Sequence, residues 1–289
     1  MSIIEKAAGK LDQMEKEGKM PPPELAGASP KDFAAKAVSR HIGRETGAPG
    51  SKQGTINLAK LRQRGMITPD DVRAQIAEEF RMIKRPLITN AFDQEMGPLK
   101  NGNLIMVTST LAGEGKTFCA VNLAMSIAME MDHTVLLVDA DVARPAIPNT
   151  LGLATEMGLL DVLLDDKLDL ADVLIRTNVE KLSVLTAGSK NKHSTELLAS
   201  QAMSDLLKEI GRRYHDRIVI FDSPPILLTS EARVLASQMG QIVLVVEAEN
   251  TTQQAVKEAL RLLEACDIIN LVCNKARSLP GGGYYGYYN

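Results

Sequence analysis

The sequence predicts an α/β fold in which a mostly parallel central sheet carries helices on both faces. From residue 103 onward, short apolar runs alternate with segments of helical periodicity, and the residues of chemical interest follow the runs. Runs that are apolar at every position are typical of parallel strands covered on both faces. In such sheets, ligands bind at the carboxyl ends of the strands. The apolar runs are Leu104–Val107, Val135–Val138, Leu182–Leu185, Ile218–Phe221, Ile242–Val246 and Ile268–Cys273.

The composition agrees with such a sheet and narrows the classes of function. The chain has 289 residues, enough for one domain of about 200 residues with extensions. Hydrophobic residues make up 45% and aromatic residues only 3%, so the core must be built from aliphatic side chains and Met. A net charge of −3 argues against nucleic-acid binding. The sequence contains no apolar stretch of about 18 residues, so no membrane-spanning helix is predicted. Cys119 and Cys273 fall in apolar segments without metal-binding spacing, which predicts buried thiols in a reducing compartment.

The segment before the sheet divides into an extension and an entry helix. Residues 2–19 place apolar side chains on one stripe, which predicts an amphipathic helix, and residues 21–55 have the composition of a linker. A second helix is expected from Pro69 to about Lys84, ended by Pro86. The predicted organisation is an N-terminal extension at 1–76, a main domain at 77–277 and a flexible tail at 278–289.

A glycine-rich segment, Thr110-Leu-Ala-Gly-Glu-Gly-Lys-Thr117, joins the first apolar run to a helical segment. In this context glycines let backbone N–H groups turn toward phosphate oxygens, Lys supplies a cation, and a Thr hydroxyl is placed for Mg²⁺. The segment therefore predicts a P-loop NTPase fold that binds ATP or ADP with Mg²⁺, although Thr110 stands where the usual pattern begins with Gly. The predicted nucleotide contacts in this segment are Gly113, Glu114, Gly115, Lys116, Thr117 and Phe118.

Three carboxylates follow two of the apolar runs and so fall at the same predicted edge of the sheet. Asp139 and Asp141 end one run two residues apart, on the same side of an extended chain, and Asp222 ends another. Mg²⁺ takes oxygen ligands and keeps several waters, so the predicted metal ligands are Thr117, Asp139 and Asp222. Asp141 is then left to accept the proton of a hydroxyl that receives a phosphoryl group. The predicted catalytic residues are Lys116, Asp139 and Asp141, although each acid alone could be a strand-end cap.

Four of the chain's five tyrosines lie within its last six residues. Interleaved glycines keep this segment flexible and unable to pack. Such a tail could enter the active site of a neighbouring copy and present its hydroxyls as phosphate acceptors, and the alternative is a low-complexity sticky end. The predicted phosphoacceptors are Tyr284, Tyr285, Tyr287 and Tyr288.

Together, these motifs resemble those of the bacterial tyrosine kinases of exopolysaccharide loci, and most closely the autokinases of exosortase-type (PEP-CTERM) gene clusters. Residues 108–117, 136–141 and 221–225 resemble the three nucleotide motifs of that family in order and spacing. Residues 78–85 resemble its E-x-x-R-x-x-R helix, which implies ring-like self-assembly. The oligomer-interface residues implied by that motif are Glu78, Arg81 and Lys84, with Arg85 as an alternative cation to Lys84.

The resemblance also implies how such a kinase works. In the homo-oligomer, the tail of one subunit is phosphorylated by its neighbour, and cycling of this phosphorylation, with a tyrosine phosphatase, controls polymer length and export. Members without membrane helices resemble half of a split system, whose other half is a membrane chain-length determinant (Wzz-like) activator. The chain is then expected to be cytoplasmic and peripheral at the inner membrane through that partner. Asn274 stands where related ATPases contact adenine, although a polar residue that ends a strand is often only a cap.

Two other classes of function are compatible with a phosphate loop. One is a partition or septum-site-selection ATPase, a nucleotide-switched dimer whose phosphate loop carries an additional Lys where this chain has Leu111. Such a switch also gives no reason for a tyrosine tail. The other is a regulatory scaffold that binds nucleotide without phosphorylating a substrate.

Overall fold

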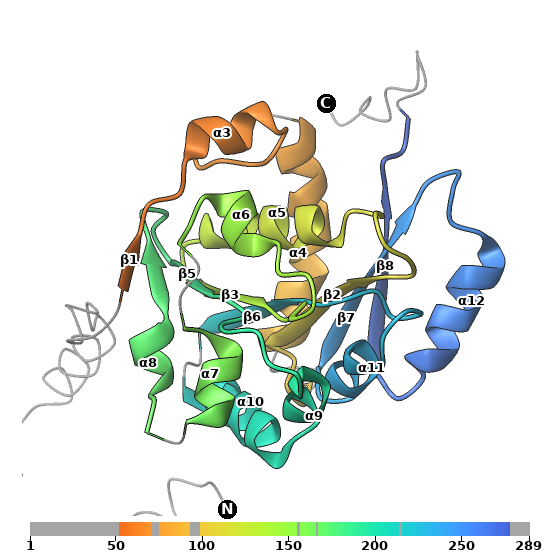
Figure 1. Cartoon of the computed structure of the whole chain (residues 1–289). Coiled ribbons are helices and arrows are strands. Elements are labelled where there is room, and N and C mark those ends of the chain that lie inside the picture. Colours follow the sequence, from red (N-terminus) through yellow and green to blue (C-terminus); the bar gives the residue numbers. More distant parts are fainter. Residues whose placement is uncertain are drawn as a thin grey trace, which may run out of the picture. The chain divides into compact units, whose positions relative to one another are not determined.

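The computed structural model describes residues 52–70, 75–92, 99–154, 157–165, 167–213 and 216–277 (Figure 1). All of these residues belong to one compact unit. The amphipathic helix predicted at 2–19, nearly all of the predicted linker and the tyrosine tail lie outside the described residues. No helix in the described ranges is both long and apolar enough to cross a membrane.

The described strands form one sheet in the order β1-β4-β5-β3-β6-β2-β7-β8. Every neighbouring pair is parallel except β4 and β5, which confirms the predicted mostly parallel sheet. All six predicted apolar runs are strands, whereas the three-residue strands β1 and β4 were not predicted. The strands are β1 (Lys52–Gly54), β2 (Leu104–Ser109), β3 (Thr134–Asp139), β4 (Ile175–Thr177), β5 (Leu182–Leu185), β6 (Arg217–Asp222), β7 (Gln241–Glu247) and β8 (Ile268–Asn274).

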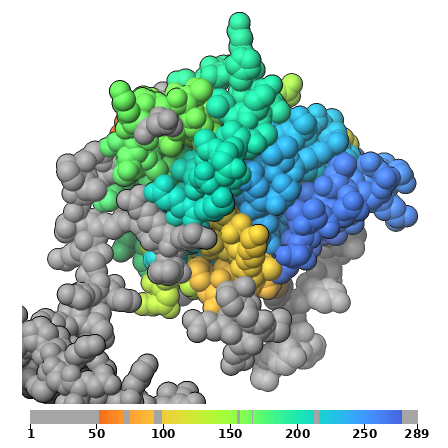
Figure 2. All heavy atoms as spheres, turned by 90° about the horizontal axis from the view of Figure 1, so that it is seen from below, coloured from red at the N-terminus to blue at the C-terminus, as the bar shows by residue number. Residues whose placement is uncertain are grey.

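Helices cover both faces of the sheet, as predicted (Figure 1). Alternate side chains of each strand point to opposite faces. Ile105 and Val107 of β2 therefore join a cluster with α3, α4 and α5, and Leu104 and Met106 join a second cluster with α7, α10, α11 and α12. Figure 2 shows the second side, where the green to blue segments from α7 onward form a continuous surface. The helices are α3 (Leu58–Gln63), α4 (Gln75–Phe92), α5 (Lys116–Ala128), α6 (Ile147–Leu151), α7 (Leu159–Leu164), α8 (Leu170–Val173), α9 (Ser194–Leu198), α10 (Gln201–Arg213), α11 (Ser230–Ala236) and α12 (Gln253–Leu262).

Helix α4 does not end at Pro86, contrary to the prediction, but continues through it to Phe92. A proline inside a helix removes one backbone hydrogen bond. Tertiary contacts offset this loss, because Leu87 is fully buried and its carbonyl accepts a hydrogen bond from the Gln241 side chain at 2.9 Å. The Gln241 amide oxygen also accepts a hydrogen bond from Asn90 at 2.9 Å. Packing against the start of β7 therefore overrides the local signal of Pro86.

The compact unit starts earlier than the predicted domain boundary between residues 76 and 77. Strand β1 pairs with β4 at the edge of the sheet, with Lys52 opposite Ile175. Leu61 and Ile67, which follow it, are 1% exposed and belong to the core cluster on the side of α5. Residues from β1 onward are therefore part of the main domain.

Strand β8 differs from the other predicted strands because it lies at the open edge of the sheet. Its residues are only half-buried or exposed. Cys273 is exposed, whereas a buried thiol was predicted, and Cys119 on α5 is buried as predicted. An apolar run alone does not distinguish a central strand from an edge strand.

Candidate active site

The phosphate loop lies between the end of β2 and the start of α5, at the carboxyl edge of the sheet. Gly113 and Gly115 have φ angles of 91° and 100°, which residues with a side chain rarely adopt. Gly115 is also closely packed, because a Cβ atom there would lie 2.1 Å from the side-chain nitrogen of Asn274. Helix α5 begins directly after it at Lys116, so the first turn of the helix directs its N–H groups toward the loop.

Thr110, which replaces the first glycine of the usual pattern, is fully buried. It does not adopt a positive φ, and its hydroxyl donates a hydrogen bond to the Glu114 carboxylate. The position therefore needs a hydrogen-bond donor in this chain rather than the conformational freedom of glycine.

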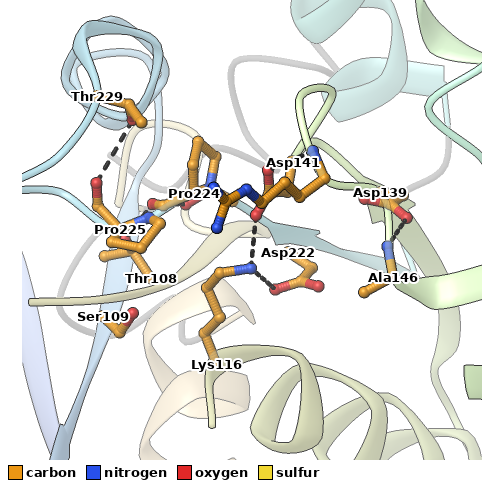
Figure 3. Close-up of polar contacts among 12 residues, drawn as sticks. Thr108, Ser109, Lys116, Asp139, Asp141, Ala146, Asp222, Pro224, Pro225 and Thr229 are labelled. Atoms are coloured by element: carbon orange, nitrogen blue, oxygen red, sulfur yellow. Dashed lines mark hydrogen bonds and ion pairs between the residues drawn. The ribbon is translucent and has the colours of Figure 1, made fainter. Parts of the chain in front are cut away.

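Lys116 lies beside Asp141 and Asp222, two of the three carboxylates that the sequence predicted at this edge (Figure 3). Its ammonium nitrogen lies 2.7 Å from Asp141 Oδ2 and 3.8 Å from Asp222 Oδ1. Asp139 and Asp222 are fully buried and directly opposite each other on β3 and β6. The parallel register of the two strands thus brings together acids that lie 83 positions apart in the sequence.

The electrostatics of this cluster follow from one cation among three acids. Burial alone would lower the pKa of Lys116, but the neighbouring Asp222 and Asp141 carboxylates raise it above its usual value. Burial raises the pKa of Asp222 to about 6, against the opposing effect of Lys116. Burial, followed by the charge of Asp222, raises the pKa of Asp139 to about 7. The cluster therefore holds more negative charge than Lys116 alone compensates.

Asp139 and Asp141 have different partners because β3 ends at Asp139. Asp139 Oδ2 accepts hydrogen bonds from the backbone N–H groups of Ala146 and Ile147, both at 3.0 Å, and so fixes the start of α6. Asp141 lies beyond the strand, where its Oδ2 contacts Lys116 and its Oδ1 accepts the Arg144 N–H at 3.1 Å. Both acids lie at the predicted edge of the sheet. They do not lie side by side on one extended strand, as was predicted, because Asp141 follows the end of β3.

The acids retain unused acceptor atoms that suit a divalent cation. Asp139 Oδ1 and both carboxylate oxygens of Asp222 are buried and accept no hydrogen bond from the described residues, although Asp222 Oδ1 forms the longer ion pair with Lys116. Buried carboxylate oxygens without partners are costly unless a ligand satisfies them. No group of three or more His, Cys, Asp and Glu in the described ranges could hold a metal ion by itself. The site thus fits Mg²⁺, which takes few protein ligands and completes its shell with waters and phosphate oxygens.

Two further predicted nucleotide contacts lie on the other side of the phosphate loop. Phe118 and Asn274 line an open cavity of about 540 Å³ between α4, the start of α5 and β8. The side-chain amide of Asn274 donates to the backbone carbonyl of Glu114 at 2.8 Å. The structure therefore brings Asn274 to the phosphate loop, although the sequence linked it only to adenine.

The charged residues of α4 do not form one exposed stripe. Glu78 and Arg81 form an ion pair with each other and remain partly exposed. Lys84 is only 3% exposed, and its ammonium group bonds to the Ser126 carbonyl and the Glu130 carboxylate within the same chain. Arg85 is exposed, so it is the available cation of the adjacent pair. The four tail tyrosines lie outside the described residues.

Thr251 is a site residue that sequence reasoning missed. It lies in the loop after β7, and its hydroxyl donates to the Glu114 carboxylate in the phosphate loop. The sequence has two consecutive threonines, Thr251 and Thr252, before α12, and only Thr252 is needed as the N-cap of that helix. The additional threonine was the only sign that Thr251 has another role.

Comparison with known proteins gives a consistent assignment. Residues 102–275 match the model of a family described as AAA domain. The chain is 31% identical over 234 residues to the tyrosine-protein kinase YwqD of Bacillus subtilis, covering 80% of this chain and 94% of that one. It is 30% identical to the tyrosine-protein kinase CpsD of Streptococcus agalactiae, covering 65% and 82%. It is also 30% identical to the tyrosine-protein kinase ptk of Acinetobacter johnsonii, but the match covers 57% of this chain and only 22% of ptk.

Solved structures agree with these relatives. The chimerical protein CapA2B2 has a TM-score of 0.60 and 26% identity, covering 82% of this chain and 97% of that chain. The kinase domain of the Escherichia coli tyrosine kinase ETK has a TM-score of 0.59 and 26% identity, covering 82% and 95%. The septum site-determining protein MinD of Pyrococcus horikoshii, solved with Mg-ADP, has a TM-score of 0.50 and 24% identity, covering 59% and 69%, which shows a shared fold alone.

Proposed function

Since this chain belongs to the bacterial tyrosine-protein kinases, and through residues 102–275 to the AAA domain family, we propose that it phosphorylates its own C-terminal tyrosines from MgATP. The observation that carries this proposal is Lys116 bound between Asp141 and Asp222 at the end of the phosphate loop. This arrangement offers a cation for the phosphates, a carboxylate for the acceptor proton and free oxygens for Mg²⁺.

The proposed binding of ATP starts from the phosphate loop. The N–H groups of 113–117 and the first turn of α5 surround the β- and γ-phosphates, and Lys116 turns from Asp141 to the phosphate oxygens. Thr117, Asp139 and Asp222 would hold Mg²⁺, which neutralises charge on the phosphates. The cavity beside Phe118 and Asn274 has mostly apolar walls and an amide at its edge, which suits a purine ring.

The proposed transfer makes Asp141 the acceptor of the tyrosine proton. A tyrosine hydroxyl has a pKa near 10, so it is neutral at pH 7 and must lose its proton as it reacts. The phenolic oxygen bonds to the γ-phosphorus, the bond from that phosphorus to the bridging oxygen of ADP breaks, and the proton passes to Asp141 Oδ2. That oxygen is bound to Lys116 in this structure, so the turn of Lys116 toward the phosphates frees it.

The acceptors in this proposal are Tyr284, Tyr285, Tyr287 and Tyr288 of a neighbouring copy in a ring-like homo-oligomer. Glu78, Arg81 and Arg85 would contact that neighbour. Arg85 replaces the predicted interface residue Lys84, because Lys84 is buried within its own chain. We further propose activation by a membrane chain-length determinant, location at the inner membrane through this partner, reversal by a tyrosine phosphatase, and a role in exopolysaccharide export. In ptk the matched region is 22% of the protein, so in that relative it is joined to a much longer chain.

The test is incubation of the full chain with MgATP and the cytoplasmic segment of a chain-length determinant protein from the same organism, followed by mass spectrometry of the C-terminal peptide. Phosphate is expected on the tail tyrosines of the parent chain. Asp141→Asn should abolish this phosphate but keep nucleotide binding. Hydrolysis of ATP with no phosphate on the tail would overturn the proposal in favour of an ATPase switch, and persistent transfer by Asp141→Asn would overturn the role of Asp141.

A further inference from the structure

Glu114 belongs to the phosphate loop, yet it is buried within the protein, with only 3% of the residue exposed. Oε1 accepts hydrogen bonds from the hydroxyls of Thr110 and Thr251, and Oε2 accepts the Leu111 N–H at 2.9 Å. No ion pair among the described residues involves this carboxylate. A buried acid without a cation is tolerated only when hydrogen bonds satisfy it, so these three donors define its position.

The direction of the hydrogen bond from Thr251 is fixed by its other partner. The Glu247 N–H donates to the Thr251 hydroxyl oxygen at 2.9 Å, so the single hydroxyl proton is free to point at Glu114. The Glu247 carboxylate in turn pairs with Lys275, just beyond β8, at 3.0 Å. A chain of contacts therefore runs from the phosphate loop through the loop after β7 to the end of β8.

A second connection closes this network. Asn274 at the end of β8 donates to the Glu114 backbone carbonyl at 2.8 Å, and the Ala248 N–H donates to the Asn274 carbonyl at 2.9 Å. Glu249 and Lys275 in the two outer loops have φ angles of 64° and 59°. Residues with a side chain adopt such angles only where their surroundings hold them. The three loops therefore behave as one connected unit at the carboxyl edge of the sheet.

We propose that Glu114 is a positioning residue that holds the phosphate loop at a fixed spacing from the loops that end β7 and β8. This inference rests on the proposed function, in which the phosphate loop takes the phosphates and the Asn274 side takes the base. The Glu114 carboxylate contacts neither end of the nucleotide in this proposal, because Thr110, Leu111 and Thr251 occupy its oxygens, and only the backbone N–H of Glu114 faces the phosphates. Its carboxylate sets the distance between the two halves of the site, so it contributes to the affinity for a whole nucleotide more than to the affinity for its phosphates.

Thr251→Val is the sharpest test, because it keeps the shape of the side chain and removes the hydroxyl, whereas Thr251→Ser keeps the hydroxyl and serves as the matched control. Binding is measured by displacement of a fluorescent ADP analogue from the full chain, with ATP and with tripolyphosphate, which has no base. Thr251→Val removes the hydrogen bond to Glu114 together with the acceptor of the Glu247 N–H. It should weaken binding of ATP about tenfold, the value of the hydrogen bond to the charged Glu114, and binding of tripolyphosphate less than about twofold. Thr251→Ser should bind ATP with nearly the affinity of the parent chain, because it keeps the hydroxyl.

Glu114→Gln provides the second variant, since its amide cannot accept from all three donors. Combined with Thr251→Val, it should weaken ATP no more than the larger single effect, because both changes break the same link. Equal weakening of ATP and tripolyphosphate, or no weakening of either, would overturn the proposal. Phosphorylation of the tail is measured separately on the parent chain. A parent chain that binds ATP but transfers no phosphate to its tail would contradict the proposed function, whereas the role of Glu114 is decided by the binding measurements.

Discussion

The ammonium group of Lys84 lies 2.7 Å from the Glu130 carboxylate, and the same group donates to the Ser126 carbonyl at 2.6 Å. These contacts join α4 to the end of α5. The Lys84 contact lowers the pKa of Glu130, which shows that the pair favours the ionised acid. A residue of the motif expected at the oligomer interface therefore holds two helices of one subunit together.

Lys84→Met is expected to lower the free energy of unfolding by about 1–3 kcal/mol, because it leaves the Ser126 carbonyl without its partner. Glu130 is partly exposed, so its lost ion pair adds little. Urea unfolding measures the change, with Arg85→Met as the matched control on the exposed side. The control should change stability by less than about 0.5 kcal/mol. Equal losses in both variants would show that Lys84 does not fix the two helices.

The raised pKa values of Asp139 and Asp222 predict a defined pH dependence for the nucleotide-free protein. An acid with a higher pKa in the folded state binds its proton more tightly there, so its stabilising contribution is complete below its ordinary pKa of 3.8. That contribution is lost as the pH rises through about 6 for Asp222 and about 7 for Asp139. Asp139→Asn keeps an oxygen for the Ala146 and Ile147 N–H groups but removes the titration.

The stability of Asp139→Asn relative to the parent chain should therefore rise between pH 4 and pH 7 and level off above pH 8. The rise is of the order of a few kcal/mol, because burial raises the pKa of Asp139 from 3.8 to about 7. Urea unfolding across this range, without Mg²⁺ or nucleotide, measures it. A difference that does not change with pH would contradict the raised pKa of Asp139.

The two glycines of the phosphate loop should respond differently to a methyl group. Both have positive φ angles, so Gly113→Ala and Gly115→Ala share a strain of about 1–2 kcal/mol. Only Gly115 would also bring its Cβ within 2.1 Å of the Asn274 side chain, whereas the Cβ at Gly113 meets nothing within 4 Å. Gly115→Ala should therefore weaken binding of a fluorescent ADP analogue at least about tenfold more than Gly113→Ala. Adding Asn274→Ala should recover part of the loss, and similar losses in both single variants would refute the contact.

Gln241 is fully buried, and its side-chain amide donates to the carbonyls of Leu87 and Gly102 at 2.9 and 2.7 Å. Gln241→Met keeps a similar volume but removes both of these hydrogen bonds and the acceptor of the Asn90 side chain, with an expected loss of about 2–4 kcal/mol in the free energy of unfolding. The exposed Gln254→Met is the control, expected within about 0.5 kcal/mol of the parent chain in the same urea experiment. Retained stability in Gln241→Met would mean that α4 past Pro86 is held by apolar packing alone.

The sheet and the placement of the acids could be predicted from the sequence because both depend on local patterns. Continuous apolar runs identified the long strands, and residues that follow such runs must meet at one edge of a parallel sheet. The short strands β1 and β4 carry no such pattern, since three residues are too few to show periodicity. Their pairing depends on the partner strand rather than on their own composition.

The partners of individual side chains could not be predicted in the same way. Lys84 follows Glu78 and Arg81 at helical spacing, and nothing in that spacing shows that it faces α5 rather than solvent. The contact between Glu114 and Thr251 joins residues 137 positions apart, which no local motif records. The acids of the site were found because their chemistry was expected, and the Thr251 hydroxyl was missed because it contacts the protein instead of a ligand.

Helix α5 has a mechanical consequence beyond its role in binding. Its 13 residues contain no Gly or Pro, and every residue from Cys119 to Ala128 is buried, so about 20 Å of helix has no hinge along its length. Lys116 at one end meets the acids of the active site, and Ser126 at the other end is held by Lys84. Helix α5 therefore links the active site to α4 through one unbroken segment, and we expect a displacement of its first turn to move the Ser126 end and, through Lys84, helix α4.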